Sequence, residues 1–229
     1  MIKPPNVYLI GLTGNIACGK SAVVAMLREL GAQTIDADQV THDLQRPGQP
    51  VYDQIVAAFG AGILAQPGGP IDRRALGAIV FTDPAELRRL EQIVHPAVRA
   101  RLAAWLKHVG EGSRGMGDGE EIGRLARPNP PAPISQPPVV AVIDAIKLLE
   151  SGWRPICDAI WVVTCAPEQQ LARLVGARGL SEAEARARIA AQPPQREKVA
   201  QASVVIDNSG SLAATREQVQ AAWRAIAAR

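Results

Sequence analysis

Residues 14–21 constrain the fold of this chain more than any other part of its sequence. They read GNIACGKS, which fits the pattern GxxxxGK[ST]. A short apolar run at 7–12 precedes them, and at 21–30 apolar residues recur at helical spacing up to Gly31. A buried strand, a glycine-rich loop and a helix in this order form a cradle of backbone N–H groups for a phosphate anion. The sequence therefore predicts nucleotide binding on an α/β fold.

Two residues of this loop carry reactive side chains with distinct roles. Lys20 is placed to reach the β- and γ-phosphates of a nucleotide, and Ser21 to ligate Mg²⁺. A thiol close to a helix N-terminus can be reactive, but a small residue that fits a tight loop is the simpler interpretation of Cys18, and we assign it no catalytic role. The residues expected to bind ATP here are Gly14, Asn15, Ile16, Ala17, Cys18, Gly19, Lys20 and Ser21.

The rest of the chain alternates predicted strands with predicted helices. Strands are expected at 33–35, 139–143, 159–164 and 203–206, and helices from 82–84 toward 106, at 167–175, at 182–191 and at 212–228. This alternation is typical of a parallel sheet covered by helices on both faces. Together with the loop it predicts the three-layer α/β fold of P-loop NTPases, with a five-stranded parallel sheet.

Composition excludes several classes of protein. A hydrophobic content of 47% over 229 residues excludes an intrinsically disordered chain. No run of 18 apolar residues indicates a membrane span, and the first residues lack the pattern of a signal peptide, so we expect a cytoplasmic protein. Three cysteines do not form a disulfide framework or a zinc motif. Only 3% of residues are aromatic, so the net charge of +3 does not indicate nucleic-acid binding.

Residues 109–138 break the alternating pattern. They contain six glycines and six prolines, with charges of both signs. Such a segment buries too little apolar surface to order itself, and a loop of this length is unusual in a compact domain. We interpret it as a flexible surface insertion that acts as a solvated spacer, with a partner-binding tail as the alternative.

The length and motifs favour a small-molecule kinase over other nucleotide-binding proteins. No Asn/Thr-Lys-x-Asp string for reading a guanine base occurs, which makes ATP the expected nucleotide. A kinase needs a carboxylate to orient the acceptor hydroxyl and take its proton. Asp36 and Asp38 follow the predicted strand at 33–35. Either one of them is the base, or both are helix-capping acids.

Further charged residues fit a kinase site but have simpler interpretations. Arg173 and Arg178 lie near the end of the predicted helix that opens at Pro167, where they fit a cationic lid over the γ-phosphate. They are equally explained as exposed arginines. Asp144 ends the predicted strand at 139–143, so it is placed either near Mg²⁺, binding it directly or through water, or as the cap of a following helix.

Taken together, these residues resemble the bacterial dephospho-coenzyme A kinase family. The opening IGLTGNIACGKSAVVAMLRELGAQTIDAD is similar to that family's start, and PGQPVYDQIVAAFG, IDRRALGAIVF, LEQIVHPAVR, LLESG, RLVGARGLSEAEARARI and VIDNSG follow in the family's order. The resemblance covers nearly the whole chain apart from the insertion. Two departures stand out: IKLLE replaces a Pro-Leu-Leu-Phe-Glu-like string, and Ala22 replaces a hydroxyl residue after the loop.

The resemblance implies ATP- and Mg²⁺-dependent phosphorylation of the ribose 3′-hydroxyl of dephospho-coenzyme A, the last step of coenzyme A biosynthesis. It makes Asp38 the general base and Arg178 a catalytic lid residue that also contacts ATP. It places Ile206, Asp207 and Asn208 near the adenine. Thr13, Arg74 and His95 would lie with Asp38 on the acceptor side, and a helix-packing role beside Pro96 is the alternative for His95.

The resemblance also implies that different regions of the chain have different functions. It implies a core over about 1–39, 139–165 and 201–229, a helical acceptor-binding region over about 40–107 and a lid over about 166–200. We expect a monomer or small homo-oligomer that acts on small-molecule substrates, without nucleic-acid or membrane partners. The alternatives are another P-loop small-molecule or nucleotide kinase, and a non-catalytic regulatory protein that binds ATP.

Overall fold

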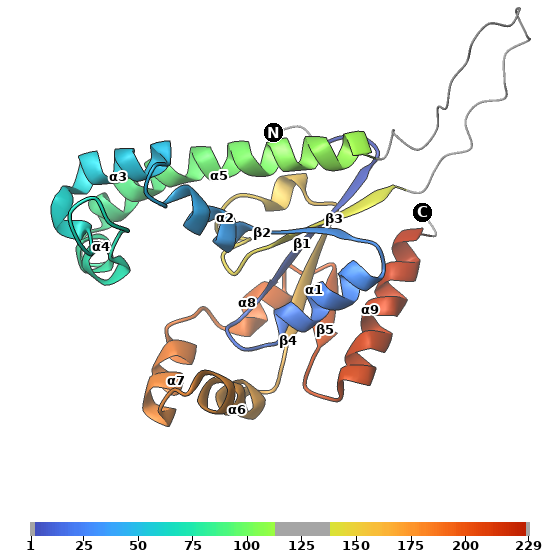
Figure 1. Cartoon of the computed structure of the whole chain (residues 1–229). Coiled ribbons are helices and arrows are strands. Elements are labelled where there is room, and N and C mark those ends of the chain that lie inside the picture. Colours follow the sequence, from blue (N-terminus) through green and yellow to red (C-terminus); the bar gives the residue numbers. More distant parts are fainter. Residues whose placement is uncertain (1–2, 113–137, 228–229) are drawn as a thin grey trace, which may run out of the picture. The chain divides into compact units, whose positions relative to one another are not determined.

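A parallel β-sheet forms the centre of the computed structural model, which describes residues 3–112 and 138–227 (Figure 1). Its strand order is β2-β3-β1-β4-β5, and the register shows β1 parallel to β3 and β4, and β4 parallel to β5. The strands are β1 (Val7–Gly14), β2 (Gln33–Asp36), β3 (Val139–Asp144), β4 (Ala159–Thr164) and β5 (Val204–Asp207). The five-stranded α/β fold predicted from the alternating pattern is confirmed.

Helices connect the strands and build a second compact unit. They are α1 (Lys20–Glu29), α2 (Ala37–Leu44), α3 (Pro50–Phe59), α4 (Arg73–Val80), α5 (Pro84–Gly112), α6 (Pro167–Arg178), α7 (Glu182–Ala190), α8 (Gln195–Val199) and α9 (Leu212–Ala227). The described chain divides into residues 35–105, here called the helical unit, and the remainder, here called the sheet unit. No helix among the described residues is long and apolar enough to cross a membrane.

The main apolar core of the sheet unit lies where α1 and α9 cover one face of the sheet. Figure 1 shows these two helices side by side, and they contact each other. Alternate residues of each strand point to the same face, so Ile10 and Leu12 of β1 join Trp161 of β4 in this core. Val23 from α1 and Val219 from α9 complete it and are fully buried. This packing fixes the start of α1, and with it the loop after β1.

The opposite face of β1 is packed closely around Gly11. A Cβ atom on Gly11 would lie 2.6 Å from Leu148 Cδ2 and 3.0 Å from both Cys157 Sγ and Ile160 Cδ1. Leu148 is fully buried, and it belongs to the connection between β3 and β4. The short helix α8 also contacts β1 and β4. The sheet therefore has an ordered layer on this face too.

The helical unit has its own core and a turn that positions α4. Tyr52 of α3 is buried and donates a hydrogen bond from its hydroxyl to the carbonyl O of Gly69 (2.7 Å). Leu64 and Ile71 form an antiparallel bridge that closes the loop between them. Asp72 then caps α4 by accepting hydrogen bonds from backbone N–H groups. The side chains that follow Asp72 therefore leave α4 in fixed directions.

The structure differs from the sequence interpretation at the first residues of the expected insertion. Residues 109–112 form the last turn of α5, and Val109 and Gly110 are buried. Glycines lower helix propensity, which is why the sequence suggested an earlier end. Here Gly110 is needed, because a Cβ would lie 2.8 Å from Pro4 Cβ, and its carbonyl O accepts a hydrogen bond from Asn6 Nδ2 (2.8 Å). The rest of the expected insertion, 113–137, lies outside the described residues.

Replacement of Gly11 by alanine tests the packing behind β1. We expect Gly11→Ala to lower the free energy of unfolding by about 1–3 kcal/mol, because the added methyl group overpacks a filled core. Thermal unfolding followed by circular dichroism measures the loss. Gly176→Ala is the matched control, since nothing lies within 4 Å of a Cβ at that position in α6. An unfolding midpoint that falls equally for the two variants would contradict the packing described here.

Candidate active site

The parallel register brings four strand ends to one edge of the sheet. Gly14 pairs with Val163, and Leu12 pairs with Asp144, so the loops after β1, β3 and β4 leave the sheet together. Thr164 pairs with Asp207, which places the end of β5 at the same edge. Ligands of open α/β sheets bind at the carboxyl ends of the strands, next to the strand where the order reverses. The loop after β1, the central strand, therefore lies at the expected position of a nucleotide site.

The loop at 14–21 has the backbone conformation that its glycines permit. Gly19 has a φ angle of +88°, and a Cβ there would lie 2.0 Å from Asn208 Nδ2. A Cβ on Gly14 would lie 2.5 Å from the carbonyl O of Val163. Ala17 also has a positive φ, 59°, which non-glycine residues rarely adopt. Both glycines are therefore required by the structure around the loop, and neither can be replaced without moving a neighbour.

Three side chains from outside the loop hold its backbone carbonyl groups. Gln170 Nε2 donates a hydrogen bond to the O of Ile16 (2.6 Å), and Arg173 Nη1 donates to the O of Ala17 (3.3 Å). Asn208 Nδ2 donates to the O of Cys18 (2.9 Å). Successive carbonyl groups are thereby engaged by the protein. In the first turn of α1 the N–H of Ala22 donates to the O of Gly19 (3.1 Å). The N–H groups of Lys20 and Ser21 before it, which come too early in the helix for an intrahelical acceptor, remain to form an anion-binding cradle.

Asn208 is itself held rigidly in place. It is 2% exposed, and its Oδ1 accepts a hydrogen bond from Thr215 Oγ1 (2.9 Å). Its backbone N–H donates to the O of Thr164 (2.8 Å), and its own O accepts from Arg173 Nη2 (2.9 Å). The side-chain amide that contacts the loop is thus fixed by both β4 and α9. Of the residues expected near the adenine, Asn208 contacts the phosphate-binding loop.

Lys20 and Asp144 form an ion pair at the carboxyl end of the sheet. The two side chains are only 15% and 12% exposed. Residues 146–150 form turns, so no regular helix begins directly after Asp144 as a capping role would require. Asp144 therefore does not cap a helix, and its place near Mg²⁺ stays a prediction. Among the described residues no cluster of three His, Cys, Asp or Glu side chains forms a preassembled metal site.

A buried lysine that sequence reasoning missed lies at the same edge. Lys198 of α8 is 4% exposed and donates a hydrogen bond from Nζ to the O of Ile146 (2.6 Å). The same carbonyl accepts from Thr13 Oγ1 (3.0 Å). Lysine is seldom fully buried unless its charge is compensated. The local sequence gives no signal for this position, because α8 is short and its place against β1 and β4 depends on the fold.

The segment between α7 and α8 contacts the phosphate-binding loop directly. The N–H of Ile16 donates a hydrogen bond to Gln192 Oε1 (2.7 Å), and Asn15 Nδ2 donates to the O of Pro193 (3.1 Å). These contacts join the loop to the region 166–200 that the resemblance identifies as a lid. No motif in the sequence singles out Gln192.

The cysteine of the loop is paired with a second thiol. Burial and a hydrogen bond with Cys165 raise the pKa of Cys18, so its thiol stays protonated at neutral pH. The same hydrogen bond, together with nearby Arg173, lowers the pKa of Cys165 to about 7. Burial raises the pKa of Cys157, the third cysteine, to about 12. A protonated, fully buried thiol agrees with a structural role for Cys18.

Two expected nucleotide contacts look different in the structure. Arg178 is the last residue of α6 and is exposed, with no hydrogen bond or ion pair to the described residues, whereas Arg173 of the same helix contacts the loop. Ile206 is 1% exposed and packs in the core against α1 and α9. Its side chain is therefore not available to a nucleotide, and only its backbone could contact one.

Of the expected acceptor-side residues, Asp38, Arg74 and His95 lie in the helical unit, whereas Thr13 is fully buried in β1 of the sheet unit. Helix α2 begins between the two acids of IDAD. Asp36 is its cap and accepts a hydrogen bond from the N–H of Gln39 (2.9 Å), while Asp38 lies in the first turn, partly buried.

The other two expected residues of this unit lie on α4 and α5. Arg74 is exposed in the first turn of α4, and its backbone N–H donates to Asp72 Oδ1 (2.8 Å). His95 lies partly buried within α5.

Comparison with known proteins gives consistent matches over almost the full length. A model of the dephospho-CoA kinase family matches residues 8–113 and 133–214. The dephospho-CoA kinase of Symbiobacterium thermophilum is 49% identical over 95% of this chain and 80% of its own length. That of Geobacillus kaustophilus is 44% identical over 93% of each chain. The unmatched residues between the two parts fall within the segment interpreted as an insertion.

Solved structures agree with these matches. A Thermus thermophilus protein of known structure superposes with a TM-score of 0.73 at 30% identity, covering 95% of this chain and 96% of its own. The dephospho-CoA kinase of Campylobacter jejuni superposes with a TM-score of 0.64 at 23% identity, covering 97% and 98%. At that identity the second match shows the fold alone.

Replacement of Asn208 tests whether its amide shapes the phosphate-binding loop. We expect Asn208→Ala to weaken ATP binding by about tenfold, because the freed carbonyl of Cys18 loses its buried donor, a loss of about 1–3 kcal/mol. Isothermal titration calorimetry with ATP measures the effect. Ser209→Ala is the control, because Ser209 binds Ala166 and Asp207 rather than the loop. Unchanged ATP affinity in Asn208→Ala would show that the loop does not depend on this contact.

The raised pKa of Cys18 predicts that its ionisation does not shape the pH dependence of activity. A thiol whose pKa is raised stays neutral from about pH 6 to 9, a range that spans the ordinary thiol pKa. We therefore expect Cys18→Ser to keep both kcat and the form of its pH profile, measured by ADP release. Disappearance of a basic limb from the profile in the variant would indicate a functional thiolate.

Proposed function

The chain belongs to the dephospho-CoA kinase family, and we propose that it transfers the γ-phosphoryl group of ATP to the ribose 3′-hydroxyl of dephospho-coenzyme A, with Asp38 as general base. The reaction is the final step of coenzyme A biosynthesis. The observation that carries the ATP side is the phosphate-binding loop, whose carbonyl groups are held by side chains and whose Lys20 lies beside Asp144.

The residues of the sheet unit suit a triphosphate and its metal ion. Lys20 carries the positive charge that the β- and γ-phosphates need. It is the first residue of α1, so the same anion also lies at the N-terminus of the helix, where N–H groups are free. Mg²⁺ prefers oxygen ligands and is commonly held by one or two carboxylates together with substrate phosphates. The Ser21 hydroxyl and the Asp144 carboxylate fit that donor set. Bound there, the ion would neutralise charge that develops on the phosphates.

Asp38 is the better of the two candidate bases. The carboxylate of Asp36 accepts a hydrogen bond from the N–H of Gln39 as the cap of α2, whereas Asp38 lies within the first turn, outside the capping position, with its side chain partly buried. In the proposed step the acceptor oxygen attacks the γ-phosphorus, the bond from that phosphorus to the β–γ bridging oxygen breaks, and ADP leaves with the electron pair. The hydroxyl proton passes to the Asp38 carboxylate.

An acceptor panel distinguishes this function from the alternatives. ADP release is measured with ATP and Mg²⁺ in the presence of dephospho-coenzyme A, AMP, CMP or shikimate, and without acceptor. We expect stimulation that is largest with dephospho-coenzyme A. Stimulation by another acceptor alone would indicate a different P-loop kinase, and ATP binding without any stimulation would indicate a regulatory protein.

Paired substitutions in IDAD test the assignment of the base. We expect Asp38→Asn to lower kcat by a factor of about 10²–10⁴ with little change in ATP affinity, since the amide cannot accept the proton. Asp36→Asn is the matched control, because asparagine caps a helix as well as aspartate does. Both variants are assayed at saturating ATP and dephospho-coenzyme A. If Asp36→Asn is the inactive variant and Asp38→Asn is not, the assignment is reversed.

A further inference from the structure

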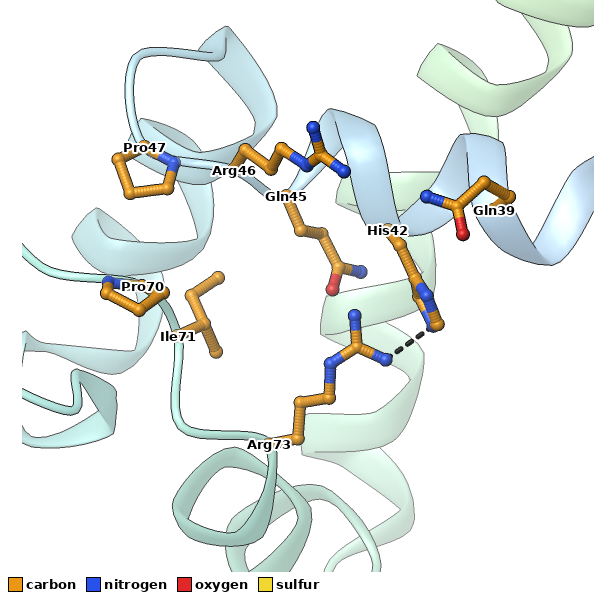
Figure 2. Close-up of a pocket in the computed structure, with 8 residues that line it drawn as sticks. All are labelled: Gln39, His42, Gln45, Arg46, Pro47, Pro70, Ile71 and Arg73. Carbon is orange, nitrogen blue, oxygen red and sulfur yellow. Dashed lines mark hydrogen bonds between the residues drawn. The ribbon is translucent and has the colours of Figure 1, made fainter.

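The helical unit contains a pocket of about 240 Å³ that the assignments above leave unused (Figure 2). Its polar side is formed by Gln39, His42, Gln45, Arg46 and Arg73. Its other side is formed by Pro47, Pro70 and Ile71. The pocket thus combines two arginines with an apolar wall, and none of the described residues that line it carries a carboxylate.

Arg73 is the strongest anion-binding group of this pocket. It is exposed at the first position of α4 and, among the described residues, lies within ion-pair distance of no carboxylate. The carboxylate of the neighbouring Asp72 accepts hydrogen bonds from the backbone N–H groups of Arg74 (2.8 Å) and Ala75 (3.3 Å) instead of pairing with the Arg73 guanidinium.

The side chains around Arg73 orient its guanidinium and leave most of its N–H donors available. Arg73 Nη1 is hydrogen-bonded to His42 Nε2, and Figure 2 shows the amide of Gln45 pointing toward the same guanidinium. A guanidinium only donates hydrogen bonds, so Nε2 of His42 is the acceptor in this contact. Arg73 has five N–H donors in a planar fork, so most of them stay available for a second acceptor.

Arg46 adds a second positive charge at the rim of the pocket. Its Nη2 lies 2.9 Å from Asp43 Oδ1, with the two side chains 68% and 50% exposed. Exposed pairs of this kind are weak, and the Asp43 carboxylate is shared with Gln39 Nε2 (3.0 Å). The pocket therefore keeps an excess of positive charge that suits a ligand with more than one negative charge.

The pocket lies one helical turn from the proposed base. His42 follows Asp38 by four residues on α2, so the two side chains lie on the same face, separated along the axis by about 6 Å at 1.5 Å per residue. In dephospho-coenzyme A the 3′-hydroxyl and the diphosphate are carried by the same ribose, on its 3′ and 5′ positions. An acceptor whose 3′-hydroxyl is at Asp38 would therefore bring its diphosphate to the region of His42.

We propose that this pocket binds the 5′-diphosphate of the acceptor, with Arg73, oriented by His42, as the principal ligand and Arg46 as the second. The inference rests on the proposed function, because it needs an acceptor whose hydroxyl is at Asp38. The apolar wall of Pro47, Pro70 and Ile71 would then face the hydrocarbon groups that follow the diphosphate in the pantetheine arm. Arg73, and not its neighbour Arg74 as the resemblance implies, would then be the arginine that binds the acceptor.

A comparison of acceptors with and without the diphosphate tests this assignment. We expect Arg73→Gln to lower kcat/KM for dephospho-coenzyme A by about 10- to 100-fold, as expected for loss of a charge-assisted bidentate contact. Its kcat/KM for adenosine, which has the hydroxyl but no phosphate, and its KM for ATP should not change. Arg73→Lys should recover part of the loss, because it restores the charge without the fork.

Arg88→Gln is the matched control, since Arg88 is exposed on α5 in the same unit and does not line the pocket. Thermal unfolding of each variant confirms that it folds. Equal losses for dephospho-coenzyme A and adenosine, or no loss for either, would overturn the assignment. If transfer to adenosine is too slow to measure, an unchanged KM for dephospho-coenzyme A in Arg73→Gln overturns it alone. No transfer to dephospho-coenzyme A by the unaltered chain would instead refute the proposed function.

Discussion

The structure of the nucleotide site depends on how the carbonyl groups of the phosphate-binding loop are held. A loop that offers N–H groups to an anion must direct its carbonyl groups elsewhere, and buried carbonyl groups need donors. Here the donors are the side chains of Gln170, Arg173 and Asn208. They come from α6 and from the end of β5, so the loop after β1 acquires its shape only when β4 and β5 are in register beside it. The parallel sheet is thus a condition for binding the phosphates.

The same principle explains how one chain serves two substrates. The sheet unit supplies fixed N–H groups and the Lys20–Asp144 pair, which suit a triphosphate and its metal ion. The helical unit supplies an acid in the first turn of α2 and a cationic pocket one turn further along, which suit a hydroxyl and a diphosphate carried by one ribose. In both units the reactive side chain lies in the first turn of a helix. Helix α1 begins after a glycine, and helices α2 and α4 begin after an aspartate that caps them.

Local patterns were sufficient to predict the loop, the strands and several helix ends. The capping box of Ser181 and Glu184 is present, and α1 is followed by Gly31 with a positive φ of 99°. Contacts that depend on the register of distant segments could not be predicted: neither Gln170 nor Lys198 belongs to a motif, and each acquires its partner only through the packing of the sheet. Arg73 and Arg74 are adjacent in sequence, and only the geometry at the start of α4 shows which of them lines the pocket. The glycine and proline content predicts an insertion from residue 109, whereas α5 continues to Gly112 because Gly110 packs against Pro4.

The phosphate-binding loop has its shape before ATP binds if the contacts described here hold it. Crystal structures of the enzyme without nucleotide and with an ATP analogue test this. We expect the same loop backbone in both, with Ala17 at positive φ and Asn208 Nδ2 hydrogen-bonded to the carbonyl O of Cys18 in each. A nucleotide-free loop in another conformation, in which Asn208 does not contact Cys18, would contradict it.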